Sequence, residues 1–329
     1  GFNKPIQVIL IPDDAVSLNE VTVLQRRKAL QRAVFTLRNV STIGSAELLK
    51  AACCNLSESF ETNPSIDVNY SDALTGTKQI QMLGLTSPYI LFTQENIPNL
   101  RGSNQTFGLS FTPGTWVESI QITKGAGAVS NGYESISGQI NAELIKPLTA
   151  LPLFINGFHT LNGRTEVNLQ GKYDLSSKWA TSLFVHANKL SQPNDNNNDG
   201  FLDLPLSKQL NVLSRLQYID SKKGWVGFAS FKALTDTKQV GQFSYIPALH
   251  KFKSQYWGGE LDTDKWEFNL KTGYVDPEIP YRSIGFQSAI SRHKQSAYFG
   301  NKNYNVSYTS YFHHLVYQSV LGTTLHKCK

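Results

Sequence analysis

The sequence predicts an all-β membrane barrel preceded by a smaller domain of mixed α and β structure. From Leu151 onward, apolar and polar side chains alternate in segments of about ten residues, as in strands that bury one face. Three tryptophans, Trp179, Trp225 and Trp266, each open such a segment after a short polar stretch. We expect their rings to form an aromatic girdle at one bilayer interface.

The connections between these segments favour a barrel over a soluble β-sandwich, which alternation alone would fit equally well. Short polar turns alternate with two longer loops, residues 191–207 and 240–251. Membrane-spanning β-barrels have short turns on one side of the bilayer and longer loops on the other. In the segment 304–312, the apolar face is predicted to carry Tyr304, Val306, Tyr308 and Phe312.

Composition narrows the class of protein further. A mean hydropathy of −0.28 and the absence of any apolar run of about 18 residues exclude a helical membrane protein. The net charge of +6 comes without a basic block, so no nucleic-acid partner is expected. Cys53, Cys54 and Cys328 predict no disulfide framework, and the adjacent pair is interpreted as buried thiols. No signal peptide is visible, so Gly1 is interpreted as a mature end or a truncation.

The first 24 residues are predicted to lie outside the mixed domain. Residues 1–15 contain a short apolar strand, which we interpret as the last strand of a missing N-terminal domain of β-sandwich type. Residues 16–24 form a short extended segment. A basic linker follows, and helices are predicted over residues 45–52 and 55–64, the second ending before Pro64.

The end of the mixed domain, residues 116–147, has the most distinctive pattern in the chain. A strand is predicted from Val117, then a turn with Gly125 and Gly127, then a second strand up to residue 145. Earlier strands are predicted within residues 66–72, 77–85 and 89–100.

This pattern resembles the end of the plug domain of TonB-dependent outer-membrane receptors. The matching positions are Val117, Glu118, Ile120, Lys124, Gly125, Gly132, Gly138, Ile140 and Asn141, and two earlier strands, residues 80–84 and 91–98, also fit the family. Leu83 departs from it, because an arginine often stands before that glycine. The departure puts in doubt an internal salt bridge that is typical of the plug.

The resemblance implies that residues 25–147 are a plug and residues 148–329 the first part of a 22-stranded barrel in the outer membrane. An open strand edge is not viable in lipid, so the remaining strands are expected beyond this sequence. The segment before the plug resembles a TonB box, which adds a strand to TonB, although an ordinary linker would look similar. Its residues are Leu18, Asn19, Glu20, Val21, Thr22 and Val23.

The function that this resemblance implies is import of a small ligand, such as a siderophore, a metal complex or a nutrient. A structural subunit of an outer-membrane complex, which keeps a plugged barrel without transport, is the alternative, and a secreted β-rich adhesin is a third. The expected partners are TonB, outer-membrane lipid, an unidentified ligand and other outer-membrane proteins. No enzyme is expected, because the sequence has no nucleophile elbow or HExxH, and His313 and His314 would face opposite sides of a strand.

An acidic loop at residues 195–203 predicts a calcium site. Its oxygen ligands would be Asp195, Asn197, Asp199, the Phe201 carbonyl and Asp203, spaced as at the start of an EF-hand loop. Leu206 stands where that loop has its bidentate glutamate, so binding should be weak, on the order of 10⁻⁴–10⁻³ M. A flexible polar surface loop would have the same composition.

Overall fold

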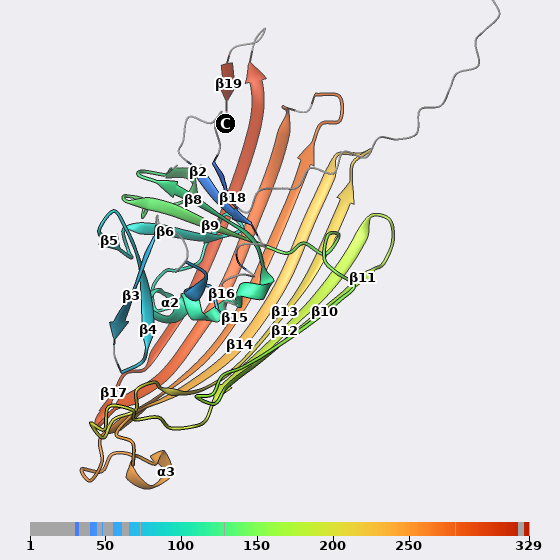
Figure 1. The fold of residues 1–329 in the computed structure, drawn as a ribbon. Helices are drawn as coiled ribbons and strands as arrows, with labels where there is room; N and C mark the ends of the chain where they lie inside the picture. The colour runs from blue at the N-terminus through green and yellow to red at the C-terminus, as the bar shows by residue number, and fades with distance from the viewer. Residues whose placement is uncertain are drawn as a thin grey trace, which may run out of the picture.

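The chain folds into a compact mixed domain and a curved antiparallel wall of long strands (Figure 1). The computed structural model describes residues 30–32, 40–44, 48, 55–60, 66–72, 74–127, 129–279, 281–321 and 326–328. The predicted strand within residues 1–15, the TonB-box segment, Cys53 and Cys54 therefore lie outside the described residues. Among those described, no helix is long and apolar enough to cross a membrane.

The mixed domain contains a six-stranded sheet in the order β1-β2-β8-β9-β6-β7 and a three-stranded sheet in the order β3-β4-β5. Strands β6 and β9 are parallel, and the other neighbours are antiparallel. The strands are β1 (Leu30–Arg32), β2 (Val40–Gly44), β3 (Asp67–Asp72), β4 (Thr77–Met82), β5 (Leu85–Thr86), β6 (Ile90–Gln94), β7 (Ile97–Pro98), β8 (Val117–Lys124) and β9 (Gly138–Leu144). The helical turns are η1 (Glu58–Phe60), α2 (Asn104–Phe107), η2 (Gly108–Phe111), η3 (Gly114–Trp116) and η4 (Val129–Asn131).

The wall is one antiparallel sheet in which each long strand pairs with the next along the chain. Its strands are β10 (Leu153–His159), β11 (Arg164–Asp174), β12 (Trp179–Leu190), β13 (Leu206–Asp220), β14 (Trp225–Gly241), β15 (Gly258–Val275), β16 (Ser283–Phe299), β18 (Val306–Leu321) and the short β17 (Lys302–Asn303) and β19 (His326–Cys328). The turns at one end are short, whereas the other end carries the loops 191–205 and 242–257, the latter with α3 (Pro247–His250).

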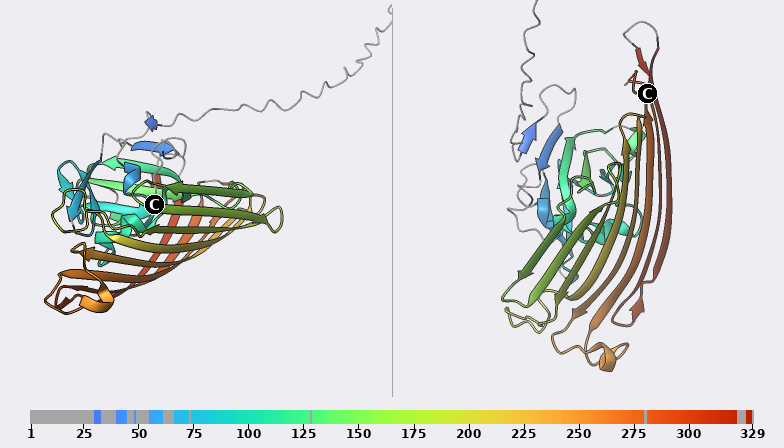
Figure 2. Two further views of the ribbon diagram at one scale, coloured as in Figure 1. Left: turned by 60° about the horizontal axis from the view of Figure 1, so that its bottom comes forward. Right: turned by 90° about the vertical axis from the view of Figure 1, so that its right-hand side faces the viewer.

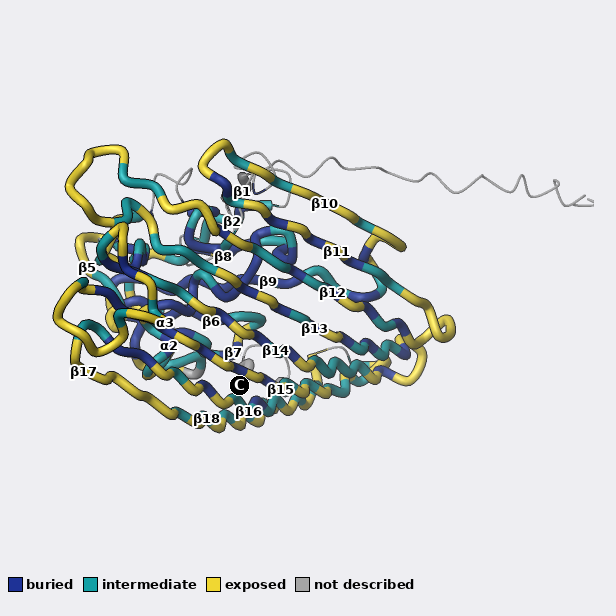
Figure 3. Tube along the Cα trace, turned by 90° about the horizontal axis from the view of Figure 1, so that it is seen from below, coloured by how far each residue is buried: buried dark blue, intermediate teal, exposed yellow. Residues whose placement is uncertain are grey.

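Buried and exposed residues alternate along the strands of the wall, as the sequence pattern predicts (Figure 3). On β15, Trp266, Phe268 and Leu270 are exposed on the outer face, whereas Lys265 and Glu267 are buried on the inner face. A face of exposed aromatic and aliphatic side chains is stable in lipid rather than in water. The mixed domain lies against the inner, concave face (Figure 2).

The core of the mixed domain extends into the wall. Ile120, Ile122 and Ile140 from its central strands are fully buried, because one face of β8 packs into the core and β9 is buried along nearly its whole length. Phe184 of β12 and Leu213 of β13 belong to the same apolar cluster. The ring of Trp116 packs against that of Phe184, with centroids 5.8 Å apart.

The structure corrects the predicted position of Trp266. Trp179 and Trp225 begin their strands and pair across them with Tyr218 and Tyr274, so both rings lie at the short-turn end. Trp266 instead lies in the middle of β15, because the polar residues before it belong to the strand rather than to a turn. It therefore cannot share their girdle.

Two other predictions also differ from the structure. In the part of the predicted helix 55–64 that is described, only the 3₁₀ turn η1 forms. The predicted helix 45–52 is not contradicted, because Leu48, its one described residue, is helical. On β18, Tyr308 and Phe312 turn toward the mixed domain, whereas Tyr311 is exposed on the outer face. Aromatic side chains occupy both faces of this strand, so their pattern did not distinguish the inside from the outside.

Candidate functional site

The tip of the β6–β7 hairpin brings a carboxylate into the wall. Glu95 and Asn96 form its two-residue turn, and both have positive φ, 54° and 64°. The Glu95 carboxylate accepts hydrogen bonds from Arg215 of β13 and Lys271 of β15. Lys271 also donates to the backbone carbonyl of Glu95, and Arg215 donates to the carbonyl of Ile145 at 2.6 Å. One acidic group of the mixed domain is thus held by two cations of the wall.

The electrostatics of this cluster favour the charged form of Glu95. Burial raises the pKa of the Glu95 carboxyl, but the charges and hydrogen bonds of Arg215 and Lys271 together lower it by more. The pKa therefore lies below the ordinary 4.5. Arg215 is itself only 3% exposed. Each group in such a buried cluster depends on its partners, because an unpaired charge there would be costly.

Asn141 of β9 holds the hairpin tip in place. Its side-chain oxygen accepts hydrogen bonds from the Asn96 backbone amide at 2.8 Å and from the Thr93 hydroxyl at 2.9 Å. Its amide group donates to Glu143 at 2.8 Å. Asn141 is 3% exposed, so these bonds stabilise a strained two-residue turn from inside the domain.

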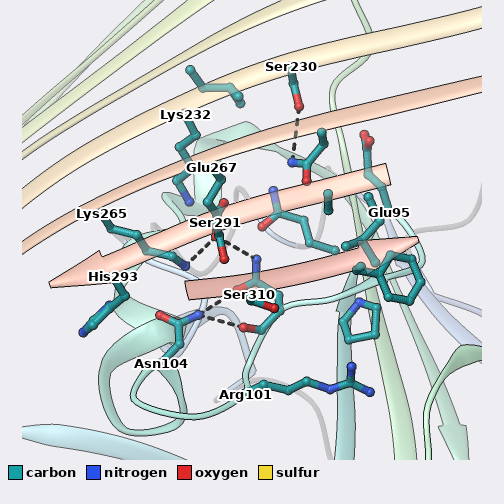
Figure 4. Close-up of a pocket in the computed structure, with 18 of the residues that line it drawn as sticks. Glu95, Arg101, Asn104, Ser230, Lys232, Lys265, Glu267, Ser291, His293 and Ser310 are labelled. Atoms are coloured by element: carbon teal, nitrogen blue, oxygen red, sulfur yellow. Dashed lines mark hydrogen bonds and ion pairs between the residues drawn. The ribbon is translucent and has the colours of Figure 1, made fainter. Parts of the chain in front are cut away.

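A second polar cluster lies beside the first, around a small cavity between the mixed domain and β14–β18 (Figure 4). Glu267 accepts a bond from Lys265 at 2.5 Å and from Asn99 of the mixed domain at 3.4 Å. Lys232 donates to the Thr112 hydroxyl at 3.3 Å. The cavity has a volume of about 40 Å³, which is room for a few waters rather than for a ligand.

Further hydrogen bonds between the mixed domain and the wall are spread along β11–β13. They join Thr115 to Asn168 (3.0 Å), Phe111 to Asn211 (2.7 Å), Ser110 to Gln209 (3.4 Å), Leu148 to Gln217 (3.0 Å) and Glu58 to Arg164 (3.1 Å). Water can replace each of these bonds at a modest net cost, about 1 kcal/mol. These polar contacts accompany the apolar contacts of the same interface, such as that of Trp116 with Phe184.

The mixed domain contains an internal ion pair, although Leu83 stands where an arginine was expected. Arg101 pairs with both oxygens of Glu134, which is 7% exposed, and its guanidinium lies 5.3 Å from the centre of the Tyr133 ring. Leu83 itself is 68% exposed and begins a tight turn with Gly84. The domain thus contains an internal salt bridge that starts from a different arginine.

The predicted calcium ligands all belong to the loop 191–205, which follows β12. The Asp195 carboxylate accepts hydrogen bonds from the backbone amides of Asp199 and Gly200, at 3.1 and 3.0 Å. Asp203 accepts bonds from the backbone and side chain of Asn196, both 2.8 Å. These bonds curl the loop on itself. In the described chain no three His, Cys, Asp or Glu side chains are grouped as metal ligands, and the calcium site stays a prediction.

The mixed domain is similar to a known domain family. Residues 33–139 match the model of the TonB-dependent receptor plug domain. The chain carries a TonB-dependent receptor plug. No curated protein matches the sequence.

Solved structures match the plug and the wall together. The siderophore receptor PiuA from Acinetobacter baumannii has a TM-score of 0.58 at 15% identity, over 80% of this chain and 37% of its own. The ferric-catecholate import receptor Fiu from E. coli K12 has a TM-score of 0.60 at 12% identity, over 86% and 45%. The FrpB iron transporter from Neisseria meningitidis reaches 0.62 at 10%, over 89% and 46%.

These matches define the architecture of the TonB-dependent receptor plug and its wall. The chain spans less than half the length of each of these three proteins. Sequence reasoning missed Glu95, Arg215 and Lys271. Each stands at an ordinary polar position of a turn or strand, and only the fold brings them together.

Proposed function

We propose that the full-length protein is a TonB-dependent transporter that imports a small ligand, such as an iron–siderophore or other metal complex, across the outer membrane. The observation that carries the proposal is the polar seating of the plug around Glu95. Apolar packing also holds the plug, as between Trp116 and Phe184, but a permanent stopper would not need charged contacts that entering water can replace when the plug moves. The similar structures of siderophore and iron receptors support the ligand class.

The proposed mechanism starts at the segment of residues 18–23, which lies outside the described residues. TonB would add a strand to this segment through main-chain hydrogen bonds. A mechanical force applied by TonB would then be transmitted through β2 and the plug sheet to the contacts between the plug and the wall. The bonds around Glu95 and Glu267 could open one at a time while water enters from the adjacent cavity.

The experiment is ligand uptake by cells that express the full-length protein, with and without TonB. We expect Val21→Pro to abolish TonB-dependent uptake while the barrel stays folded, because proline removes an amide donor from the added strand. Ala15→Pro, outside the segment, is the matched control and should transport normally. Uptake that is unchanged by Val21→Pro would contradict the proposal and favour a structural subunit of an outer-membrane complex.

A further inference from the structure

Two lysines stand side by side on the outer face of the wall. Lys189 of β12 and Lys208 of β13 are directly opposite each other in the register, and both are exposed. Directly opposite residues have Cβ atoms about 4.5–5.5 Å apart, and like charges there destabilise the pairing. Their neighbours in the same row are Thr165 and Thr237, both exposed and uncharged. Neither lysine forms an ion pair with any residue that the structure describes.

The position of this pair along the barrel is specific. Lys189 lies ten residues from Trp179 along β12, and Lys208 lies ten residues from Tyr218 along β13. At about 3.3 Å per residue and a strand tilt of roughly 35–45°, this separation is about 23–27 Å along the membrane normal. The apolar band of such barrels is about 25 Å tall. The Trp179–Tyr218 pair therefore marks one interface, and the two lysines lie at the other.

The residues below the pair support this placement. Toward the short-turn end, the next outward positions on these strands are Ala187 and Leu210, and Leu210 is 47% exposed. Leu183 and Val167, also on the outer face, are 49% and 51% exposed. The lysine pair thus sits at the upper edge of the lipid-facing surface, on the side of the long loops, which face the cell exterior in outer-membrane barrels.

We propose that Lys189 and Lys208 bind the phosphate of an outer-leaflet glycolipid whose acyl chains cover the apolar surface below them. A phosphate between the two ammonium groups would remove their repulsion, and lysine is a common phosphate binder. The Thr237 hydroxyl provides a further donor beside Lys208, whereas the Thr165 hydroxyl is hydrogen-bonded to His159 at 2.8 Å. The site is continuous with the lipid-facing wall, so it selects a lipid headgroup rather than a soluble anion.

The test is lipid binding to the full-length protein in detergent, measured by native mass spectrometry with added diphosphoryl lipid A. We expect the double variant Lys189→Gln/Lys208→Gln to bind roughly 30-fold more weakly, because each of the two lysines near an anionic surface contributes about 1 kcal/mol. Lys189→Arg/Lys208→Arg, which keeps both charges, should bind as the parent protein does. Lys222→Gln/Lys223→Gln is the matched control, because it removes two neighbouring exposed lysines at the opposite end of the barrel.

Three outcomes would overturn the proposal. One is equal binding by the double variant and the Lys222/Lys223 control. A second is unchanged binding of a lipid A that lacks both phosphates. A third is competition by excess inorganic phosphate, which would identify a soluble-anion site. If the double variant does not fold, the single variants Lys189→Gln and Lys208→Gln give the same readout, each with a smaller loss expected. The result is independent of ligand transport.

Discussion

Glu95 of the plug and Arg215 of strand β13 form an ion pair inside the barrel, although 120 residues separate them in the chain. Lys271 completes the cluster from 176 residues away. The plug carries the acid and the wall carries both cations, so displacement of the plug would leave two positive charges on the wall.

Glu95→Gln should loosen the plug. The amide keeps the size of the side chain but leaves Arg215 and Lys271 without a counter-charge, and removing one partner of a buried ion pair costs about 3–5 kcal/mol. We expect faster hydrogen exchange in β6 and β7, measured by mass spectrometry, with little change in the barrel strands. Glu278→Gln, an exposed carboxylate in a short turn, should leave the exchange unchanged. Equal exchange in both variants would show that the cluster does not seat the plug.

The same cluster predicts how the seating depends on pH. The pKa of Glu95 is lower in the folded protein than the ordinary 4.5, so the unfolded state binds more protons in this range. The stabilisation is complete above pH 4.5 and is lost as the pH falls through the lower, folded-state pKa. Hydrogen exchange of β6 and β7 should therefore change less between pH 7 and 5 than between pH 4 and 3, after correction for intrinsic exchange rates. Glu95→Gln should lack this acid-dependent step.

Asn141→Ala should destabilise the hairpin that presents Glu95. The change leaves the Asn96 amide without its side-chain acceptor, which costs about 1–3 kcal/mol for a buried group. We expect a lower free energy of unfolding of the plug in urea. Asn69→Ala removes an exposed bond to Gln81 and serves as the control, with a much smaller effect. Losses of equal size would mean that Asn141 does not hold the turn.

The calcium prediction is tested by titration of the full-length protein. We expect weak binding, with a Kd on the order of 10⁻⁴–10⁻³ M, and its loss in Asp195→Asn/Asp199→Asn. The Asp199 and Gly200 amides donate to different oxygens of Asp195, and asparagine keeps one of these oxygens, so one of the two bonds can persist in the variant. Asp67→Asn, on the exposed side of β3, should bind calcium as before. Isothermal titration calorimetry compares calcium binding by the two variants and by the unmodified protein. If the unmodified protein gives no heat of binding, the prediction is wrong and the loop is stabilised by its own hydrogen bonds alone.

The sequence by itself determined the class of fold and much of its detail. Alternation of Trp266, Phe268 and Leu270 with Glu267 and Asn269 assigned the two faces of β15, because successive side chains of a strand point to opposite sides. The turns before Trp179 and Trp225 marked the start of β12 and β14. These features depend on neighbours a few residues apart, so local geometry is sufficient to predict them.

Only the tertiary structure decided which polar groups meet. Nothing local connects Glu95 with Arg215 and Lys271, since their contact depends on the register of three wall strands and on the depth of the plug. The inner and outer faces of β18 and the place of Trp266 also required the full pairing, because aromatic rings are compatible with lipid and with the plug alike. Contacts between distant segments depend on how the whole chain folds, so a short sequence pattern does not predict them.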